Sequence, residues 1–429
     1  MFAPLVILSA SDRPAWTALS LPLCVLLPPF ILFIQSSLLF SPSASSPSLA
    51  YLRRALVPLA ILGILPLGFS HHFSGIQQFS DLNNLWALYA LVLSGKSIEL
   101  GFRSETPKWI GWVGDEVKGQ TIKKEEKVQR DQNVARWVLA WRYVVSFRNI
   151  GFSTGLSPSF YAPHPAPIPR FQAIVRELKI ILQCYLFLDF ILLPYTFHPK
   201  FGSLELSHEG SLYAPFGNWP VWATSYGLAL ISGLSLHVVQ TFMYHILAVH
   251  GILLAKSPVE SLYWPSLFQV PEAATSLSSL WGRRWHQLFR ASLGFCGFEF
   301  AKKLGAPRAF ALMFTFFLSA LLHYLAVEAQ GRPASTHGPT WPLPLFFIMQ
   351  GVGIIMEGLF EKLTKRKVRG IGGRIWTWGW MLFWGRGAME VYVRRGQPES
   401  MSQGSLGAGR PFKWALKELS RRNGWGLYD

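Results

Sequence analysis

A short basic and aromatic segment between two long apolar stretches contains the first residues whose types suggest chemistry. It reads LWGRRWHQLFR, from Leu280 to Arg290, and His286 directly follows the second of its two tryptophans. A second histidine, His323, lies 37 residues farther on, in the apolar sequence TFFLSALLHYLAVE. Imidazole has an unperturbed pKa of about 6.5, so it can take a proton from a substrate hydroxyl at neutral pH. The two histidines are therefore candidates for general-base chemistry.

His323 is the clearest polar side chain within an apolar segment. Such a side chain is costly in a bilayer and marks a candidate functional site. A helical face through Ser319, His323 and Val327 gives the imidazole a polar neighbour one turn away. Burial disfavours the charged form and keeps the ring ready to accept a proton. The same pattern also fits a histidine that only forms a hydrogen bond between two helices, and the sequence leaves both interpretations open.

Other ionisable residues in the apolar segments indicate two further chemistries. His245 and His250 form an HxxxxH pair, a pattern found in membrane di-iron enzymes, but the eleven histidines are scattered and form no HxxHH motif. We therefore expect no metal site. Asp189, Glu299 and Glu357 lie within or beside apolar segments, and a membrane terpene cyclase would use such a carboxyl group to start a cyclisation. Because these acids show no pairing in the sequence, helix packing or cavity lining is the simpler interpretation.

The elements that must position these residues are membrane helices. Of the 429 residues, 50% are hydrophobic and 15% are charged, whereas soluble proteins have roughly 25% charged residues. The apolar residues gather in segments of about 18 to 25 residues, the length of a helix that crosses the hydrocarbon core. We expect an all-α, polytopic membrane protein with about eight transmembrane helices. The apolar segments are residues 18–40, 55–69, 82–100, 171–195, 221–255, 309–327, 343–360 and 375–393.

The positive charges predict how these helices are oriented. The net charge is +17. Lysine and arginine are concentrated in the loops at 41–54, 101–170, 256–308 and 362–374. Such loops face the cytoplasm and anionic lipid headgroups, and no soluble basic domain is evident that would bind nucleic acid. The basic tail then falls on the opposite side, so we expect either that segment 375–393 does not fully cross or that segment 221–255 contains a further span.

Three phrases in the sequence resemble a known family. They are WGRRWHQLFR from Trp281 to Arg290, LLHYL around His323, and FRNIGF from Phe147 to Phe152, with Asn149 where glycine is usual. In order and spacing they resemble the wax synthase-like branch of the membrane-bound O-acyltransferases, over about residues 140–395. The closest likeness is to fungal members that acetylate secondary metabolites such as terpenoids, meroterpenoids and trichothecenes.

The resemblance implies transfer of an acyl group from acyl-CoA to an alcohol at the endoplasmic reticulum. His323 would be the catalytic base and His286 the second polar residue of the site. Direct attack of the alcohol on the thioester needs no covalent nucleophile and no tightly bound cofactor. The expected partners are acetyl-CoA, a small apolar alcohol and membrane lipid. The residues expected to bind the CoA co-substrate are Arg283, Arg284, Trp285 and Arg290, with Trp281 and Trp285 anchoring the loop at the level of the headgroups.

The regions of the chain follow from this interpretation. We expect N-terminal transmembrane helices in 1–100, a basic cytoplasmic or interfacial loop in 101–170, the acyltransferase core around a tunnel in 171–395, and a basic tail in 396–429. The N-terminus lacks the features of a cleaved signal peptide, so we expect a retained first helix. The three cysteines are far apart and have no metal-like spacing.

The identity of the acyl donor and of the alcohol stays open. The fungal likeness favours acetyl-CoA and a hydroxyl on a polycyclic metabolite. A wax synthase, which joins a fatty acyl group to a long-chain alcohol, is the first alternative, and a membrane terpene cyclase is the second. A transporter would show matching halves with broken helices, and the sequence contains no convincing repeat.

Overall fold

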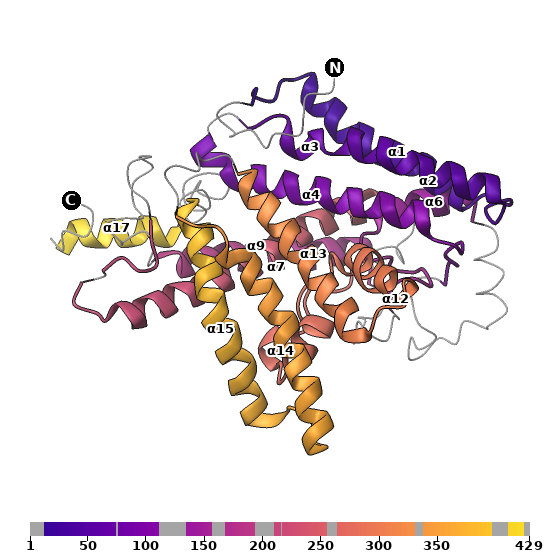
Figure 1. Ribbon diagram of the computed structural model, residues 1–429. Coiled ribbons are helices and arrows are strands. Elements are labelled where there is room, and N and C mark those ends of the chain that lie inside the picture. Colours follow the sequence, from indigo (N-terminus) through magenta and orange to yellow (C-terminus); the bar gives the residue numbers. More distant parts are fainter. Residues whose placement is uncertain are drawn as a thin grey trace.

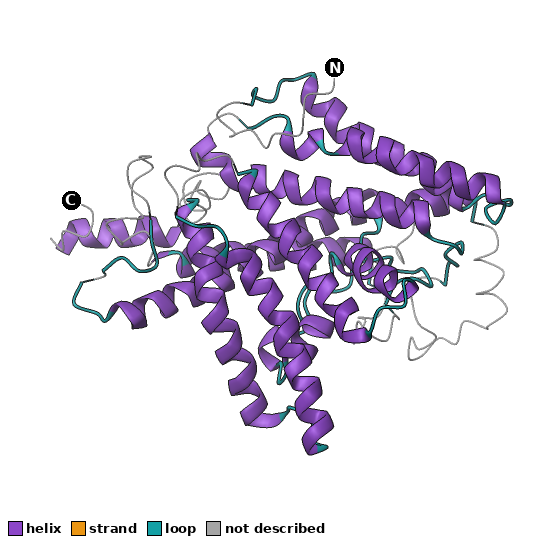
Figure 2. Ribbon diagram, viewed as in Figure 1, coloured by secondary structure: helices purple, strands orange, loops and turns teal. Residues whose placement is uncertain are grey.

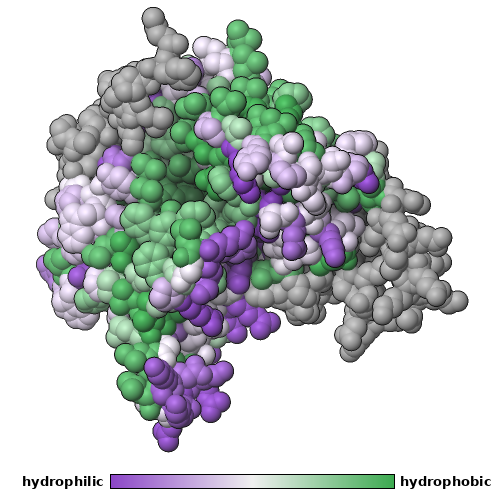
Figure 3. Space-filling view, turned by 45° about the vertical axis from the view of Figure 1, so that its right-hand side comes forward, coloured by the Kyte–Doolittle hydropathy of each residue, from purple (hydrophilic) through white to green (hydrophobic). Residues whose placement is uncertain are grey.

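The predicted all-α architecture is confirmed by a computed structural model. It describes residues 13–73, 76–110, 134–156, 168–193, 210–215, 217–254, 264–330, 338–396 and 411–423. Within these ranges the chain forms helices and no β-strand, apart from two isolated bridges (Figure 2). Apolar side chains cover a broad part of one face of the molecule (Figure 3), as expected for a surface that contacts lipid tails.

Each of the eight apolar segments forms a long helix. These are α1 (Ser20–Leu39), α2 (Pro47–Ile64) continued by α3 (Pro66–Phe69), α4 (Ile76–Phe102), α7 (Arg170–Ile191), α9 (Val221–Leu254), α13 (Arg308–Glu328), α14 (Pro342–Thr364) and α15 (Gly370–Arg394). Six of them are long and apolar enough to span a membrane, and α7 and α15 are not among the six. Segment 221–255 forms a single helix of 34 residues, so the expectation that this segment contains a further span is wrong.

The N-terminal helices pack as one layer. Helices α1, α2 and α4 lie side by side (Figure 1), and α6 (Arg136–Val145) packs against α1. The buried residues of this layer include Leu32, Ile64, Leu93 and Tyr143. The layer is joined to the rest of the molecule by contacts between α4 and α13.

The remaining helices form the second part of the bundle. Helix α7 packs on α9, α9 on α15, and α14 lies between α13 and α15 (Figure 1). The final helix, α17 (Pro411–Asn423), packs on α7, where Asp189 Oδ2 accepts a hydrogen bond from the Phe412 backbone N–H at 2.7 Å. Asp189 therefore holds the C-terminal helix.

Contacts at both ends of α15, the helix before the basic tail, define its course in the bundle. Arg395, directly after α15, donates hydrogen bonds to both carboxylate oxygens of Glu328, the last residue of α13, at 3.0 and 3.1 Å. At its other end, α15 passes so close to Thr275 that a Cβ on Gly373 would lie 2.3 Å from the Thr275 carbonyl oxygen. These contacts place the end of α15 beside the end of α13 and the start of α15 beside the segment 264–294. Helix α15 is not among the six helices that are long and apolar enough to span a membrane, so whether it crosses fully or in part stays a prediction.

Candidate active site

A cavity of about 1960 Å³ lies within the bundle and is lined by α4, α9, the segment 264–294, α13, α14 and α15. Small-molecule pockets usually measure roughly 300–1,000 Å³. The cavity is therefore large enough for two substrates at once. Both predicted catalytic histidines, His286 and His323, are among its lining residues.

His323 lies on α13 with a defined tautomer. Its Nδ1 is 2.7 Å from the backbone carbonyl oxygen of Ser319, one turn earlier. A carbonyl oxygen only accepts hydrogen bonds, so Nδ1 must carry the proton and Nε2 is left as the acceptor. The ring stacks on Phe347 of α14, with 4.0 Å between ring centroids and 24° between planes. The imidazole is thus held in place with an unprotonated nitrogen, which is the state that a general base requires.

His286 reaches the same cavity from the loop before α13. It follows a short π-helical stretch, Leu280–Arg284, and the extended residue Trp285. Its ring packs edge-on against Phe289 at 5.3 Å, and Phe289 in turn lies 6.4 Å from the ring of His323. Its Nδ1 is buried and has no hydrogen-bond partner among the described residues. Burial, and then the neighbouring charges of His323, His237 and Arg148, lower the pKa of His286 to about 3, so this imidazole is neutral at physiological pH.

Glu357 positions the loop that carries His286. Its two carboxylate oxygens accept hydrogen bonds from the backbone N–H groups of Leu277 and Ser278, at 2.6 and 2.9 Å. Its Oε1 also accepts from Trp376 Nε1 at 3.0 Å. A carboxylate at the first turn of a helix satisfies N–H groups that otherwise lack partners. Glu357 is therefore fully engaged in holding the loop.

The three arginines expected to bind CoA have different positions. Arg290 lines the cavity, and its Nη1 donates hydrogen bonds to the Gly282 carbonyl oxygen and to Gln287 Oε1. Arg284 does not line the cavity; its Nη1 donates to the carbonyl oxygens of Gln269 and Val270, both at 3.1 Å. Arg283 is exposed and is also absent from the cavity lining.

The two tryptophans of the motif pack inside the bundle. Trp281 Nε1 donates a hydrogen bond to Gln350 Oε1 at 3.2 Å, and the Trp281 ring contacts Phe316 and Phe347 at centroid distances of 6.0 and 6.2 Å. Trp285, which was expected to bind the co-substrate, lines the cavity, and its ring centroid lies 5.3 Å from that of Phe268. Both rings thus contribute to the wall of the cavity, which differs from the expected anchoring among headgroups.

Several cavity residues were not identified from the sequence. The ring of His237 on α9 stacks on Phe268, with 4.1 Å between the ring centroids, and His237 lines the cavity. The one sequence feature that indicates it is that it is a histidine within an apolar segment. Five cationic residues that line the cavity outside the motif are Arg103, Arg148, Arg308, Lys367 and Arg386. They come from separate parts of the chain, so no local pattern could have assembled them.

The HxxxxH pair has partners outside the cavity. His245 Nδ1 forms a hydrogen bond with Glu177 Oε2 of α7. His250 Nδ1 lies 2.8 Å from the Ile246 carbonyl oxygen on its own helix. Each histidine thus has its own neighbour, and neither lines the cavity.

Comparison with known proteins finds similarity to acyltransferases. Residues 264–349 match the profile of the Membrane bound O-acyl transferase family. The chain is 30% identical over 164 residues to acetyltransferase aurG from Calcarisporium arbuscula, covering 35% of this chain and 37% of that protein. It is 28% identical over 278 residues to acetyltransferase pyr8 from Aspergillus fumigatus, covering 58% and 62%.

A plant protein gives a further match. The chain is 30% identical over 125 residues to the probable long-chain-alcohol O-fatty-acyltransferase 8 from Arabidopsis thaliana, covering 28% of this chain and 36% of that protein. The chain thus spans less than two thirds of the length of these relatives. The predicted resemblance to the wax synthase-like membrane-bound O-acyltransferases is confirmed.

Proposed function

We propose that this chain, a relative of the membrane-bound O-acyltransferases, transfers an acetyl group from acetyl-CoA to a hydroxyl of an apolar secondary metabolite such as a terpenoid or meroterpenoid. The reaction would take place within the membrane, and the endoplasmic reticulum is the proposed compartment. One observation carries the proposal: the Ser319 carbonyl sets the His323 tautomer, so that Nε2 can accept a proton in a cavity that it shares with His286.

The reaction begins with the alcohol hydroxyl next to His323. His323 Nε2 takes the hydroxyl proton while the oxygen attacks the thioester carbonyl carbon, and a C–O bond forms. The C–S bond then breaks, and the CoA thiolate receives the proton from His323. Atoms and charges balance without a covalent enzyme intermediate.

His286 would stabilise the charge that develops on the thioester oxygen. Because its Nδ1 has no partner and its low pKa keeps the ring neutral, the single ring proton is placed most favourably on Nε2. A neutral N–H donor directed at a developing oxyanion is a common source of rate acceleration, worth roughly 2.7–4 kcal/mol when one donor is removed. His286 is therefore proposed as a hydrogen-bond donor and His323 as the base.

The cationic residues indicate where the CoA phosphates would bind. Arg290, Arg308, Arg103 and Lys367 line the cavity and belong to loops that the positive charge assigns to the cytoplasmic side. Along α13, Arg308 precedes His323 by fifteen residues, a separation of about 22 Å in a helix. The charged end of the donor would thus lie far from the reacting carbonyl, beside groups that bind phosphate well.

Transfer of a fatty acyl group to a long-chain alcohol is the second candidate. The cavity volume and the similarity to the probable long-chain-alcohol O-fatty-acyltransferase 8 from Arabidopsis thaliana favour it. Terpene cyclisation has less support, because Glu357 and Asp189 each accept backbone hydrogen bonds and so are poorly placed to deliver a proton.

The test is release of free CoA from microsomes that contain the chain, supplied with acetyl-CoA or palmitoyl-CoA and a panel of terpenoid and fatty alcohols. We expect alcohol-dependent release with acetyl-CoA and a loss of about 10²–10⁴-fold in His323→Ala. His250→Ala is the matched control, because His250 makes the same contact with a carbonyl oxygen four residues earlier but lies outside the cavity. Release with palmitoyl-CoA alone would favour the wax synthase, and release that survives in His323→Ala would contradict the mechanism.

A further inference from the structure

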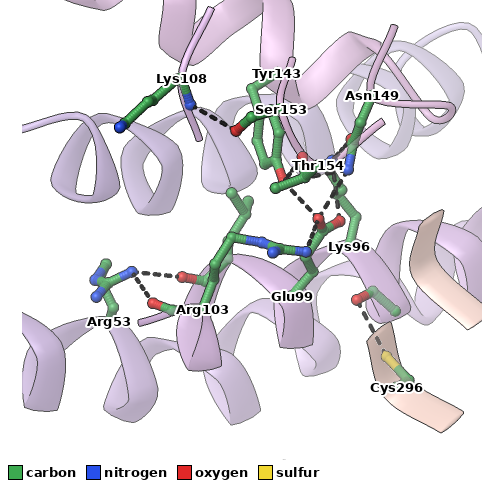
Figure 4. Close-up of polar contacts among 12 residues, drawn as sticks. Arg53, Lys96, Glu99, Arg103, Lys108, Tyr143, Asn149, Ser153, Thr154 and Cys296 are labelled. Carbon is green, nitrogen blue, oxygen red and sulfur yellow. Dashed lines mark hydrogen bonds and ion pairs between the residues drawn. The ribbon is translucent and has the colours of Figure 1, made fainter. Parts of the chain in front are cut away.

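A buried ionic cluster that does not include the two histidines was not identified from the sequence (Figure 4). Lys96 and Glu99, one turn apart on α4, are both fully buried, with Nζ and Oε2 3.1 Å apart. Glu99 Oε1 accepts hydrogen bonds from the Tyr143 hydroxyl at 2.5 Å and from Arg103 Nη2 at 2.8 Å. The Lys96 ammonium lies 3.7 Å from the centre of the Tyr143 ring.

Asn149 connects this cluster to the turn after α6. Its Oδ1 accepts a hydrogen bond from Lys96 Nζ at 2.6 Å, and its Nδ2 donates to Glu99 Oε1 at 2.9 Å. Its backbone is left-handed, with φ at 50°, a conformation that asparagine tolerates better than most residues. The two charges therefore hold the Asn149 side chain from both sides and keep the turn in this conformation.

The neighbouring residue, Arg148, extends the connection to the catalytic segment. Its guanidinium donates hydrogen bonds to the carbonyl oxygens of Pro265 and Ser266, at 2.9 and 3.2 Å, and to the Tyr244 hydroxyl at 3.2 Å. Arg148 is itself buried. It thus fastens the start of the segment that leads to the catalytic loop.

From Ser266 the contacts continue to the histidines. Ser266 Oγ donates a hydrogen bond to the Phe268 carbonyl oxygen at 2.7 Å. The Phe268 ring stacks on His237 at 4.1 Å and packs edge-on against His286 at 5.9 Å. A continuous series of contacts therefore runs from the buried ion pair on α4 to the catalytic cavity.

We propose that Lys96, Glu99, Tyr143 and Asn149 form a positioning site for the acyl-transfer centre. The cluster fixes the turn that presents Arg148, and Arg148 holds the 264–268 segment so that Phe268 places His286 and His237 in the cavity. Charged residues buried in a membrane protein are costly, and this role gives a reason for two of them on α4. The proposal rests on the proposed function, because the positioned histidines are those of acyl transfer.

The first test measures backbone order by hydrogen–deuterium exchange in detergent. Two variants remove the cluster: Asn149→Ala, and Lys96→Met combined with Glu99→Gln, which removes the Lys96–Glu99 ion pair and leaves Arg103 with a neutral amide oxygen as acceptor. We expect exchange in residues 264–290, including the Gln269 and Trp285 amides that are hydrogen-bonded to Arg284 and Leu280, to rise about tenfold or more. Glu177→Gln is the matched control, because Glu177 is 2% exposed and pairs with His245 between α7 and α9. Unchanged exchange in both cluster variants would overturn the proposal.

The second test uses the kinetics of the same variants. A positioning role predicts that kcat of Asn149→Ala falls at least about tenfold while its KM for the acyl-CoA stays within about twofold, since Asn149 does not line the cavity. In the double variant only kcat is compared, because Glu99→Gln also changes the hydrogen-bond partner of Arg103, a residue of the proposed donor site. Equal loss in Glu177→Gln would assign the effect to general destabilisation and overturn the proposal. If the wild type transfers no acyl group but exchange in 264–290 rises, the positioning contacts stand and the proposed function fails. If the wild type is active and exchange does not change, the proposed function stands and the positioning site fails.

Discussion

At the scale of residues, the two histidines differ because their neighbours differ. His323 has a backbone carbonyl that fixes its proton on Nδ1, whereas the buried Nδ1 of His286 has no partner in the described part of the chain. The first arrangement fits the proposed base, and the second fits the proposed neutral donor. The same residue type thus acquires two proposed roles from its surroundings.

The low pKa of His286 predicts how stability depends on pH. The folded state keeps this ring neutral down to a pKa of about 3, while the unfolded ring takes a proton near its ordinary value of about 6.5. Between these values the unfolded state binds more protons, so stability falls as the pH is lowered through this window. When the pH is lowered from about 6.5 to about 4.5, we expect the melting temperature of His286→Asn to fall less than that of the wild type. The melting temperature is measured by tryptophan fluorescence in detergent. An equal loss in both proteins would contradict the neutral, buried state of His286.

Arg308 provides a test of the donor site. It is exposed, begins α13 and lines the cavity. We expect Arg308→Met to raise KM for acetyl-CoA about tenfold with little change in kcat, because one phosphate contact is lost without disturbing the histidines. Lys362→Met, on the exposed end of α14 and outside the cavity lining, should change neither constant. Equal effects of the two substitutions would indicate only a general effect of positive charge.

At the scale of elements, the close approach of α13 to the segment before it determines how His323 reaches the cavity. A Cβ on Gly297 would lie 2.7 Å from the Cα of Thr315, a backbone atom of α13. Thr315 lines the cavity two turns before His323. Only glycine lets the two elements pack at this distance.

Gly297→Ala is therefore expected to push α13 away from its neighbour. Overpacking of this kind costs about 1–3 kcal/mol, and we expect both a lower melting temperature and lower acyl transfer. Gly227→Ala on α9 is the control, because nothing lies within 4 Å of the Cβ it would add. A Gly297→Ala protein as stable and active as Gly227→Ala would show that this approach does not position α13.

At the scale of the whole molecule, the length of α15 predicts on which side of the membrane the C-terminal helix lies. Its 25 residues extend about 37 Å as a helix, more than the roughly 30 Å of the hydrocarbon core. One end follows the basic turn after α14, and the other lies beside Glu328 at the end of α13. The basic turn and the C-terminal helix α17 are therefore expected on opposite sides of the membrane.

Cysteine labelling in sealed microsomes tests this arrangement. In a cysteine-free background, Arg366→Cys should react with an impermeant maleimide from the outside, which corresponds to the cytoplasmic side. Arg421→Cys on α17 should react only after the membrane is permeabilised. Labelling of both positions in intact microsomes would mean that α15 does not cross.

The sequence by itself determined the helical class, the positions of the long apolar helices and the two histidines of the cavity. These features depend on local properties, namely the length of apolar segments and the cost of a polar side chain within them. The tertiary structure alone decided which arginines line the cavity, that Glu357 holds the loop, and that Lys96 and Glu99 are joined to Asn149. Those roles depend on partners far away in the chain, such as Leu277 for Glu357, and an isolated sequence segment does not specify which distant groups will satisfy a buried charge.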